Sequence, residues 1–227
     1  RLPTAGLAAA DTRCDSHPRS CLTWVMAIRP VVIHGEPVLH RVASRVERFD
    51  DELAELVQDM YDTMDAAHGV GLAAPQIGVG LRVFVYDMAN HDGVPSRGVV
   101  VNPILAVSKV PSGRPDPDEE SEGCLSVPGE HFPLRRAETA KVNGQDLTGA
   151  PFEFTATDWF ARCMQHEFDH LNGKLYVDRL DDKQTRKARK AIKNNGWGKP
   201  GHSWMPGADP DPFGHGDIDA DGDDHDL

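Results

Sequence analysis

The feature that most constrains this chain is the segment HEFDH at residues 166–170, which lies within an expected helix over about residues 158–172. At about 100° per residue, His170 lies about 40° and Glu167 about 100° from His166, on the same arc as most of the apolar residues. The remaining arc is polar: Arg162, Gln165, Asp169 and Asn172. Burying two histidines and a glutamate is costly unless a divalent metal compensates. The segment therefore predicts a metal-binding helix that is packed into a core.

Two histidines do not complete a catalytic metal site, so a third ligand must come from elsewhere in the chain. No Glu follows Glu167, which excludes the downstream Glu ligand of thermolysin-like peptidases, and Tyr176 stands where a metzincin has its third histidine. We favour Cys124, because Gly123 before it and a short apolar strand after it present a thiolate at a strand edge. A Cys/His/His set leaves one tetrahedral position for water. Three aspartates remain candidates without a motif: Asp178, Asp181 and Asp182.

The composition describes one domain with tails. The chain has 227 residues, is 39% hydrophobic, and has no apolar run near the roughly 20 residues of a membrane span. Its net charge of −12 does not indicate the basic surface that nucleic-acid-binding proteins have. Residues 207–227 hold eight Asp and no Lys or Arg. Residues 1–25 lack the apolar region of a signal peptide. The four cysteines are therefore expected to be free or metal-bound thiols in a reducing compartment.

The chain divides into three parts by composition. We expect residues 1–25 to be a disordered N-terminal extension, and Met26 to be the natural start. Residues 26–195 form the expected catalytic domain. Residues 196–227, rich in Gly, Pro and Asp, are expected to be a disordered acidic tail.

Periodicity predicts the main elements of the domain. An amphipathic helix of about 17 residues is expected within residues 49–69, with acidic residues in its first turn and Gly69 past its end. Residues 81–88 and 98–107 read as strands, and residues 138–157 as a hairpin with a turn signal at Asn143-Gly144. A charged, exposed helix is expected over residues 181–195. These elements predict an α+β fold.

Three motifs together carry a resemblance to a known family. "GVGLAAPQIG" (69–78), "EGCLS" (122–126) and "QHEFDHLNG" (165–173) resemble the three motifs of the peptide deformylases, in order and spacing. The resemblance covers about residues 28–190 and is strongest to actinobacterial members. It implies antiparallel β-sheets packed around the central metal-binding helix. It also implies metal-dependent hydrolysis of the N-terminal formyl group from the formyl-methionine of nascent polypeptides, with release of formate.

The resemblance also implies a role for each site residue. Metal-bound water attacks the formyl carbon, Glu167 acts as general base and then acid, and the Gln76 side chain and the Leu125 N–H stabilise the oxyanion. The implied metal ligands are Cys124, His166 and His170. The implied substrate-binding residues are Val70, Gly71, Gly123 and Cys163. Glu122 and Arg136 match a supporting ion pair. The sequence departs from many relatives at Arg162, where they have an apolar residue, and in the polar loop 111–121.

The implied cofactor is one divalent metal per chain, with Fe²⁺ favoured and Zn²⁺, Ni²⁺ or Co²⁺ able to occupy the site. The implied partners are N-formyl-methionyl nascent peptides and, in a transient encounter, the ribosome, without nucleic acid specificity or a membrane; the expected location is cytoplasmic. Two other readings are disfavoured. A peptidase for internal bonds lacks its downstream ligand, and a non-catalytic metal module that contacts the ribosome has no need of Glu167 and Gln76.

Overall fold

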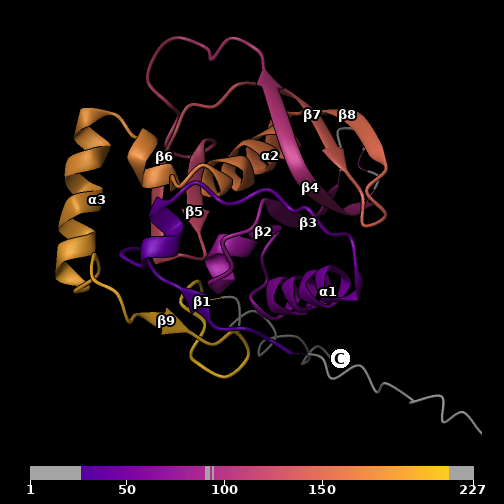
Figure 1. Ribbon diagram of the computed structural model, residues 1–227. Coiled ribbons are helices and arrows are strands. Elements are labelled where there is room, and N and C mark those ends of the chain that lie inside the picture. The colour runs from indigo at the N-terminus through magenta and orange to yellow at the C-terminus, as the bar shows by residue number, and fades with distance from the viewer. Residues whose placement is uncertain (1–26, 90–92, 94, 215–227) are drawn as a thin grey trace, which may run out of the picture.

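The structure is a computed structural model that describes residues 27–89, 93 and 95–214. The predicted extension at residues 1–25 and the end of the predicted tail, residues 215–227, lie outside the described residues. Figure 1 shows the described part as one body, with helix α2 between a large sheet and a small hairpin. No helix within the described ranges is long and apolar enough to cross a membrane.

The large sheet has five antiparallel strands in the order β2-β3-β4-β7-β8. Its strands are β2 (Gly71–Ala73), β3 (Val83–Ala89), β4 (Pro95–Val107), β7 (Thr139–Gln145) and β8 (Pro151–Thr157). The two predicted strands and the predicted hairpin are therefore present. Strand β2 lies at one edge of this sheet, which leaves its outer backbone edge outside the five-stranded ladder.

Two helices cover opposite faces of the sheet. The predicted amphipathic helix is α1 (Asp51–Ala66), with Asp50 as its side-chain N-cap. It packs its apolar stripe on Val83 and Val85 of β3, whereas α2 (Asp158–Leu171) packs on Phe84 and Tyr86. Side chains alternate between the two faces of a strand, so alternate residues of β3 pack into the apolar cores on the two faces of the sheet. The α+β prediction with a central helix is confirmed.

The arc of α2 that the sequence leaves polar is buried as well. The Arg162 guanidinium donates to the Leu134 carbonyl at 2.7 Å, and Gln165 exchanges two hydrogen bonds with the backbone of Ala137, at 3.1 and 2.8 Å. The segment 134–137 therefore covers this side of α2. Buried polar groups are tolerated here because each one finds a partner.

The remaining elements surround the other side of α2. Strands β5 (Ser121–Cys124) and β6 (Val127–Pro133) form a two-stranded hairpin. This hairpin packs with the short helices η1 (Pro37–His40) and η3 (Tyr176–Arg179) and with α3 (Asp182–Asn194). A further short helix, η2 (Ala74–Ile77), follows β2. Helix α3 is the predicted charged helix, and among its residues only Ala188 is buried.

Two local predictions are wrong. Asn143 and Gly144 do not form the hairpin turn; they lie inside β7, and the chain turns instead at residues 146–149. Gly144 is needed for close packing, because a Cβ atom there would lie 2.4 Å from Cγ1 of Val100. The predicted disordered tail begins too early, since residues 196–214 are folded onto the domain. Strand β9 (Ser203–Trp204) pairs with β1 (Val31–Val32), because the buried Trp204 packs into an apolar cluster that composition does not reveal.

Candidate metal centre

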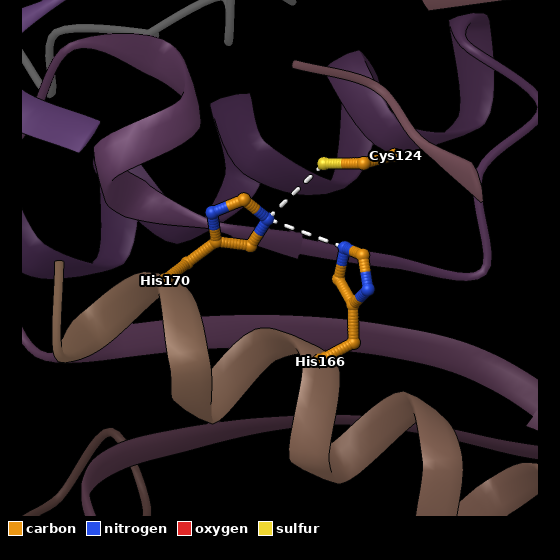
Figure 2. A group of neighbouring side chains, drawn as sticks. All are labelled: Cys124, His166 and His170. Carbon is orange, nitrogen blue, oxygen red and sulfur yellow. Dashed lines mark hydrogen bonds between the residues drawn. The ribbon is translucent and has the colours of Figure 1, made fainter. Parts of the chain in front are cut away.

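Three side chains from two elements converge in the middle of the molecule. His166 and His170 lie one turn apart on α2, and Cys124 is the last residue of β5. Nε2 of His170 lies 3.3 Å from Sγ of Cys124 and 3.3 Å from Nε2 of His166. Figure 2 shows the two rings rising from the same helix towards the thiol, which approaches from the opposite segment. All three residues are buried and their ligand atoms lie within 4.8 Å of one another.

This trio is the candidate metal group among the residues that the structure describes. A thiolate and two imidazoles are ligands that suit a tetrahedral divalent metal with one open position. Of the three aspartates left open by the sequence, Asp182 is exposed in the first turn of α3, and the other two have other contacts. Asp178 accepts a hydrogen bond from the Leu175 N–H at 2.9 Å, and Asp181 caps α3 through the Gln184 N–H at 2.8 Å. The ligand set that fits is therefore Cys124, His166 and His170.

A buried ion network holds His166 in place. Nδ1 of His166 lies 2.6 Å from a carboxylate oxygen of Glu122, which orients Nε2 towards the other ligands. Glu122 also accepts hydrogen bonds from Arg136, at 2.6 and 3.0 Å, and from Arg162, at 3.0 Å. Burial alone raises the pKa of Glu122, but Arg136 and His166 outweigh burial and hold that pKa below its ordinary value. Glu122 is therefore a charged acceptor for the imidazole.

Arg136 links this network to the next turn of α2. Its guanidinium also donates to Asp169 at 2.6 Å, and Asp169 is paired with Arg179 of η3. The sequence prediction of an ion pair between Glu122 and Arg136 thus lies within a larger set of charges. Unpaired charges in such a buried place would be strongly destabilising.

Glu167 lies beside the ligands but takes no part in the ion network. Its carboxylate is buried, and within the described part of the chain Oε2 has no hydrogen-bond partner. Burial raises the pKa of Glu167 to about 7, although the nearby His166 acts in the opposite direction. A carboxyl group of this kind can both accept and return a proton near neutral pH.

A pocket of about 240 Å³ opens onto two members of the trio, Cys124 and His166. The predicted site residues that line it are Val70, Gly71, Gln76, Glu122, Gly123, Cys124, Leu125, Cys163, His166 and Glu167. His170 and Arg136 are the two that do not. The Gln76 side chain is fixed because its oxygen accepts from the Ala73 N–H at 2.8 Å, and its amide nitrogen then lies 3.7 Å from Sγ of Cys124. The pocket therefore contains two of the ligands, an oriented amide and a carboxylate oxygen that has no partner within the described part of the chain.

The comparison with known families decides the identity of this site. Residues 28–186 match the family described as polypeptide deformylase. The chain belongs to that family. Membership makes it a hydrolase that removes the N-formyl group from nascent peptides. Together with the Cys/His/His trio, membership also indicates a single metal ion.

Relatives from the family align with most of this chain. A peptide deformylase of Mycolicibacterium vanbaalenii is 56% identical over 197 residues, which is 84% of this chain and all of that protein. One of Rhodococcus opacus is 56% identical over 196 residues, again all of that protein and 85% of this chain. The predicted likeness to actinobacterial members is confirmed.

Among solved structures, the crystal structure of a deformylase from Legionella pneumophila is 42% identical, with a TM-score of 0.63, over 75% of this chain and 96% of that one. A Synechococcus elongatus deformylase in complex with actinonin is 31% identical, with a TM-score of 0.64, over 86% of this chain and 96% of that one. These neighbours support the deformylase fold.

The pocket also contains residues that sequence reasoning missed. Met88, His131 and Phe213 line it, although they come from β3, β6 and the C-terminal segment and share no motif with the ligands. Trp159, the second residue of α2, is 52% exposed and lies at the pocket with Arg162. The guanidinium of Arg162 stacks 5.0 Å from the centre of the Trp159 ring. Only the departure at Arg162 could have signalled this part of the pocket.

Proposed function

We propose that the deformylation reaction takes place in this pocket, with Glu167 as the general base and then the general acid. The observation that carries the proposal is the convergence of three ligand atoms beside one pocket, which two of the ligands line together with Glu167, whose Oε2 has no partner among the described residues. A divalent metal held by Cys124, His166 and His170 supplies Lewis acidity, which makes water a nucleophile near neutral pH.

Glu167 moves the proton that the reaction requires. Water adds its oxygen to the formyl carbon while Glu167 takes one of its protons. The carbon–nitrogen bond then breaks, Glu167 gives that proton to the departing amine nitrogen, and formate and a free N-terminus are released. A pKa of about 7 for Glu167 suits both halves of this transfer.

Two donors are proposed to stabilise the oxyanion that forms on the formyl oxygen. They are the Gln76 side-chain amide, which its bond to the Ala73 N–H directs towards Cys124, and the backbone N–H of Leu125, the residue after Cys124. Fixed donors at such a position lower the barrier because they need no reorganisation during the reaction. Losing one donor of this type costs about 3–4 kcal/mol of barrier.

The substrate is proposed to bind as an added strand. Gly71 begins the edge strand β2, Val70 directly precedes it, and Gly123 of β5 lines the same pocket, so an extended peptide is proposed to pair with these backbone segments. The methionine side chain would then occupy the deep end of the pocket beside Cys163. The pKa of the Cys163 thiol is raised well above its ordinary value by burial, which keeps this thiol neutral.

Fe²⁺ is the proposed physiological ion, since the resemblance favours it and a mixed thiolate and imidazole set accepts Fe²⁺, Zn²⁺, Ni²⁺ or Co²⁺. Element analysis of anaerobically purified protein tests this choice. The proposed organisation keeps residues 26–195 as the catalytic domain, with residues 196–214 folded against it. The proposed location is cytoplasmic.

A transient encounter with the ribosome is also proposed, because the substrate emerges there. Helix α3 supports it with exposed basic side chains, which favour anionic RNA surfaces without sequence specificity. These side chains are Lys183, Arg186, Lys187, Arg189, Lys190 and Lys193.

The decisive test is Glu167→Gln. This change keeps the shape of the side chain but removes its ability to take a proton, so formate release from formyl-Met-Ala-Ser should fall by at least about 100-fold while one metal ion per chain remains bound. Glu153→Gln, on the exposed face of β8, is the matched control and should keep full turnover. Normal turnover by Glu167→Gln would overturn the mechanism. Cleavage of a blocked internal peptide by the unmodified chain would favour a general peptidase instead.

A further inference from the structure

The C-terminal segment Ser203–Gly214 lies beyond the residues that match the family and yet reaches the pocket. The family match ends at residue 186. After α3 the chain returns beneath the β5–β6 hairpin, where β9 pairs with β1 (Figure 1). The segment then continues to Phe213, which lines the same pocket as Cys124 and Glu167.

Two contacts fasten this segment to the hairpin that carries Cys124. The Trp204 indole N–H donates to the Leu125 carbonyl at 2.9 Å, and Trp204 itself is buried. Pro212 packs so closely on the hairpin that a Cβ atom on Gly129 would lie 2.9 Å from its carbonyl oxygen. Gly129 also has a φ of 71°, which favours glycine. The hairpin therefore has a glycine at the position where the C-terminal segment approaches it closely.

The Phe213 ring has a defined place on the pocket wall. It is half-buried and packs edge-on to His131, with ring centres 5.9 Å apart, and against Trp204 at 6.3 Å. The His131 ring in turn covers Gly123, since a Cβ atom on Gly123 would lie 2.6 Å from Nε2 of His131. Phe213 thus adds to the pocket wall next to His131, the residue that covers Gly123.

We propose that Phe213 is a specificity-determining residue, which contacts an apolar side chain downstream of the formyl-methionine of the substrate. This inference rests on the proposed strand-like binding mode. In that mode the methionine fills the deep end beside Cys163, so the residues that follow it run outward past Gly123 and His131. A half-exposed aromatic ring at that place favours apolar over polar side chains of similar size.

The experiment measures kcat/KM for two formylated tripeptides, formyl-Met-Leu-Leu and formyl-Met-Asn-Asn, which differ in polarity more than in size. We expect the unmodified metal-loaded chain to prefer the leucine peptide. Phe213→Ala should lower the ratio of the two kcat/KM values by about tenfold, the lower end of the effect of one methylene group in an apolar pocket. Phe213→Leu should keep most of the ratio because it retains an apolar side chain.

The ratio separates substrate contact from general damage, because a merely structural loss lowers both values together. Ile104→Ala removes an exposed apolar side chain of β4 outside the pocket and should keep the ratio. If Phe213→Ala does not fold, Phe213→Gln compared with Phe213→Leu gives the same comparison of a polar and an apolar side chain. A ratio unchanged by these polar or truncated variants overturns the inference alone. No formate from either peptide with the unmodified chain overturns it together with the proposed function.

Discussion

At the scale of single residues, Gly71 shows how the backbone makes room for the chemistry. A Cβ atom at this position would lie 2.5 Å from Oε1 of Glu167 and 3.0 Å from Sγ of Cys163. Gly71 does not have a positive φ, so alanine fits its backbone, and only the side chains beyond it must move. Glycine at 71 is therefore required by the position of Glu167 and not by a turn.

Gly71→Ala should lower kcat/KM by about 100-fold, because displacing a catalytic group by roughly 1 Å has an effect of this size. Metal content should stay at one ion per chain, since none of the three ligands is among the atoms nearest to the new methyl group. The matched control is Gly80→Ala, whose Cβ atom would meet only Cγ2 of Val38, at 3.8 Å. Activity of Gly71→Ala within threefold of the control would show that Glu167 has no fixed position.

At the scale of elements, the turn between β7 and β8 depends on Asp146. Its carboxylate accepts hydrogen bonds from the Thr148 N–H and hydroxyl, at 2.8 and 2.6 Å, and from the Ala150 N–H at 3.0 Å. These bonds lower the pKa of Asp146, led by the bond from the Thr148 side chain. A lowered pKa in the folded state means that the charged form stabilises the fold above the unfolded pKa.

Asp146→Ala should therefore lower the thermal unfolding midpoint at pH 7, and the difference from the unmodified chain should shrink as the pH falls through the folded pKa of Asp146. Thermal unfolding followed by circular dichroism between pH 7 and pH 3 gives the measurement. Asp118→Ala, in the exposed loop before β5, provides a surface control. An equal difference at all pH values would rule out the charge of Asp146 as the cause.

The same element scale explains what the sequence could predict. Helix α1 and strands β3 and β4 follow from local periodicity, and the ligands follow from a short motif on one helix plus one cysteine. The prediction of a turn at Asn143-Gly144 was wrong because Gly144 is required for tertiary packing, where Val100 approaches the backbone closely. Phe213 was missed because it reaches the pocket only through contacts with His131 and Trp204, which no sequence spacing encodes.

At the scale of the whole molecule, the metal site joins parts of the fold that also meet through packing and through the ion network around Glu122. His166 and His170 belong to α2, which packs on the five-stranded sheet, whereas Cys124 belongs to the hairpin packed with α3. A metal bound to all three residues therefore bridges two of the hydrophobic clusters. It also compensates three polar groups that the apo chain must keep buried.

Removal of the metal should lower the stability of the entire domain and not of α2 alone. A ligand that binds only the folded state adds about 2.7 kcal/mol when its free concentration is 100 times its dissociation constant. A chelator should therefore lower the unfolding midpoint of the unmodified chain, in a single transition. Cys124→Ser should bind little metal and respond little to the chelator, because the thiolate that bridges to the hairpin is lost.

Cys163→Ser is the matched control for this comparison, since it alters another buried cysteine of the same pocket that is outside the ligand group. It should retain one metal ion per chain and the full response to the chelator, whatever its own midpoint. Separating metal content from midpoint matters because either serine could destabilise a core by itself. If both serine variants kept the metal and the response, Cys124 would not be a ligand, and the bridge between the hairpin and α2 would have to be made by another residue.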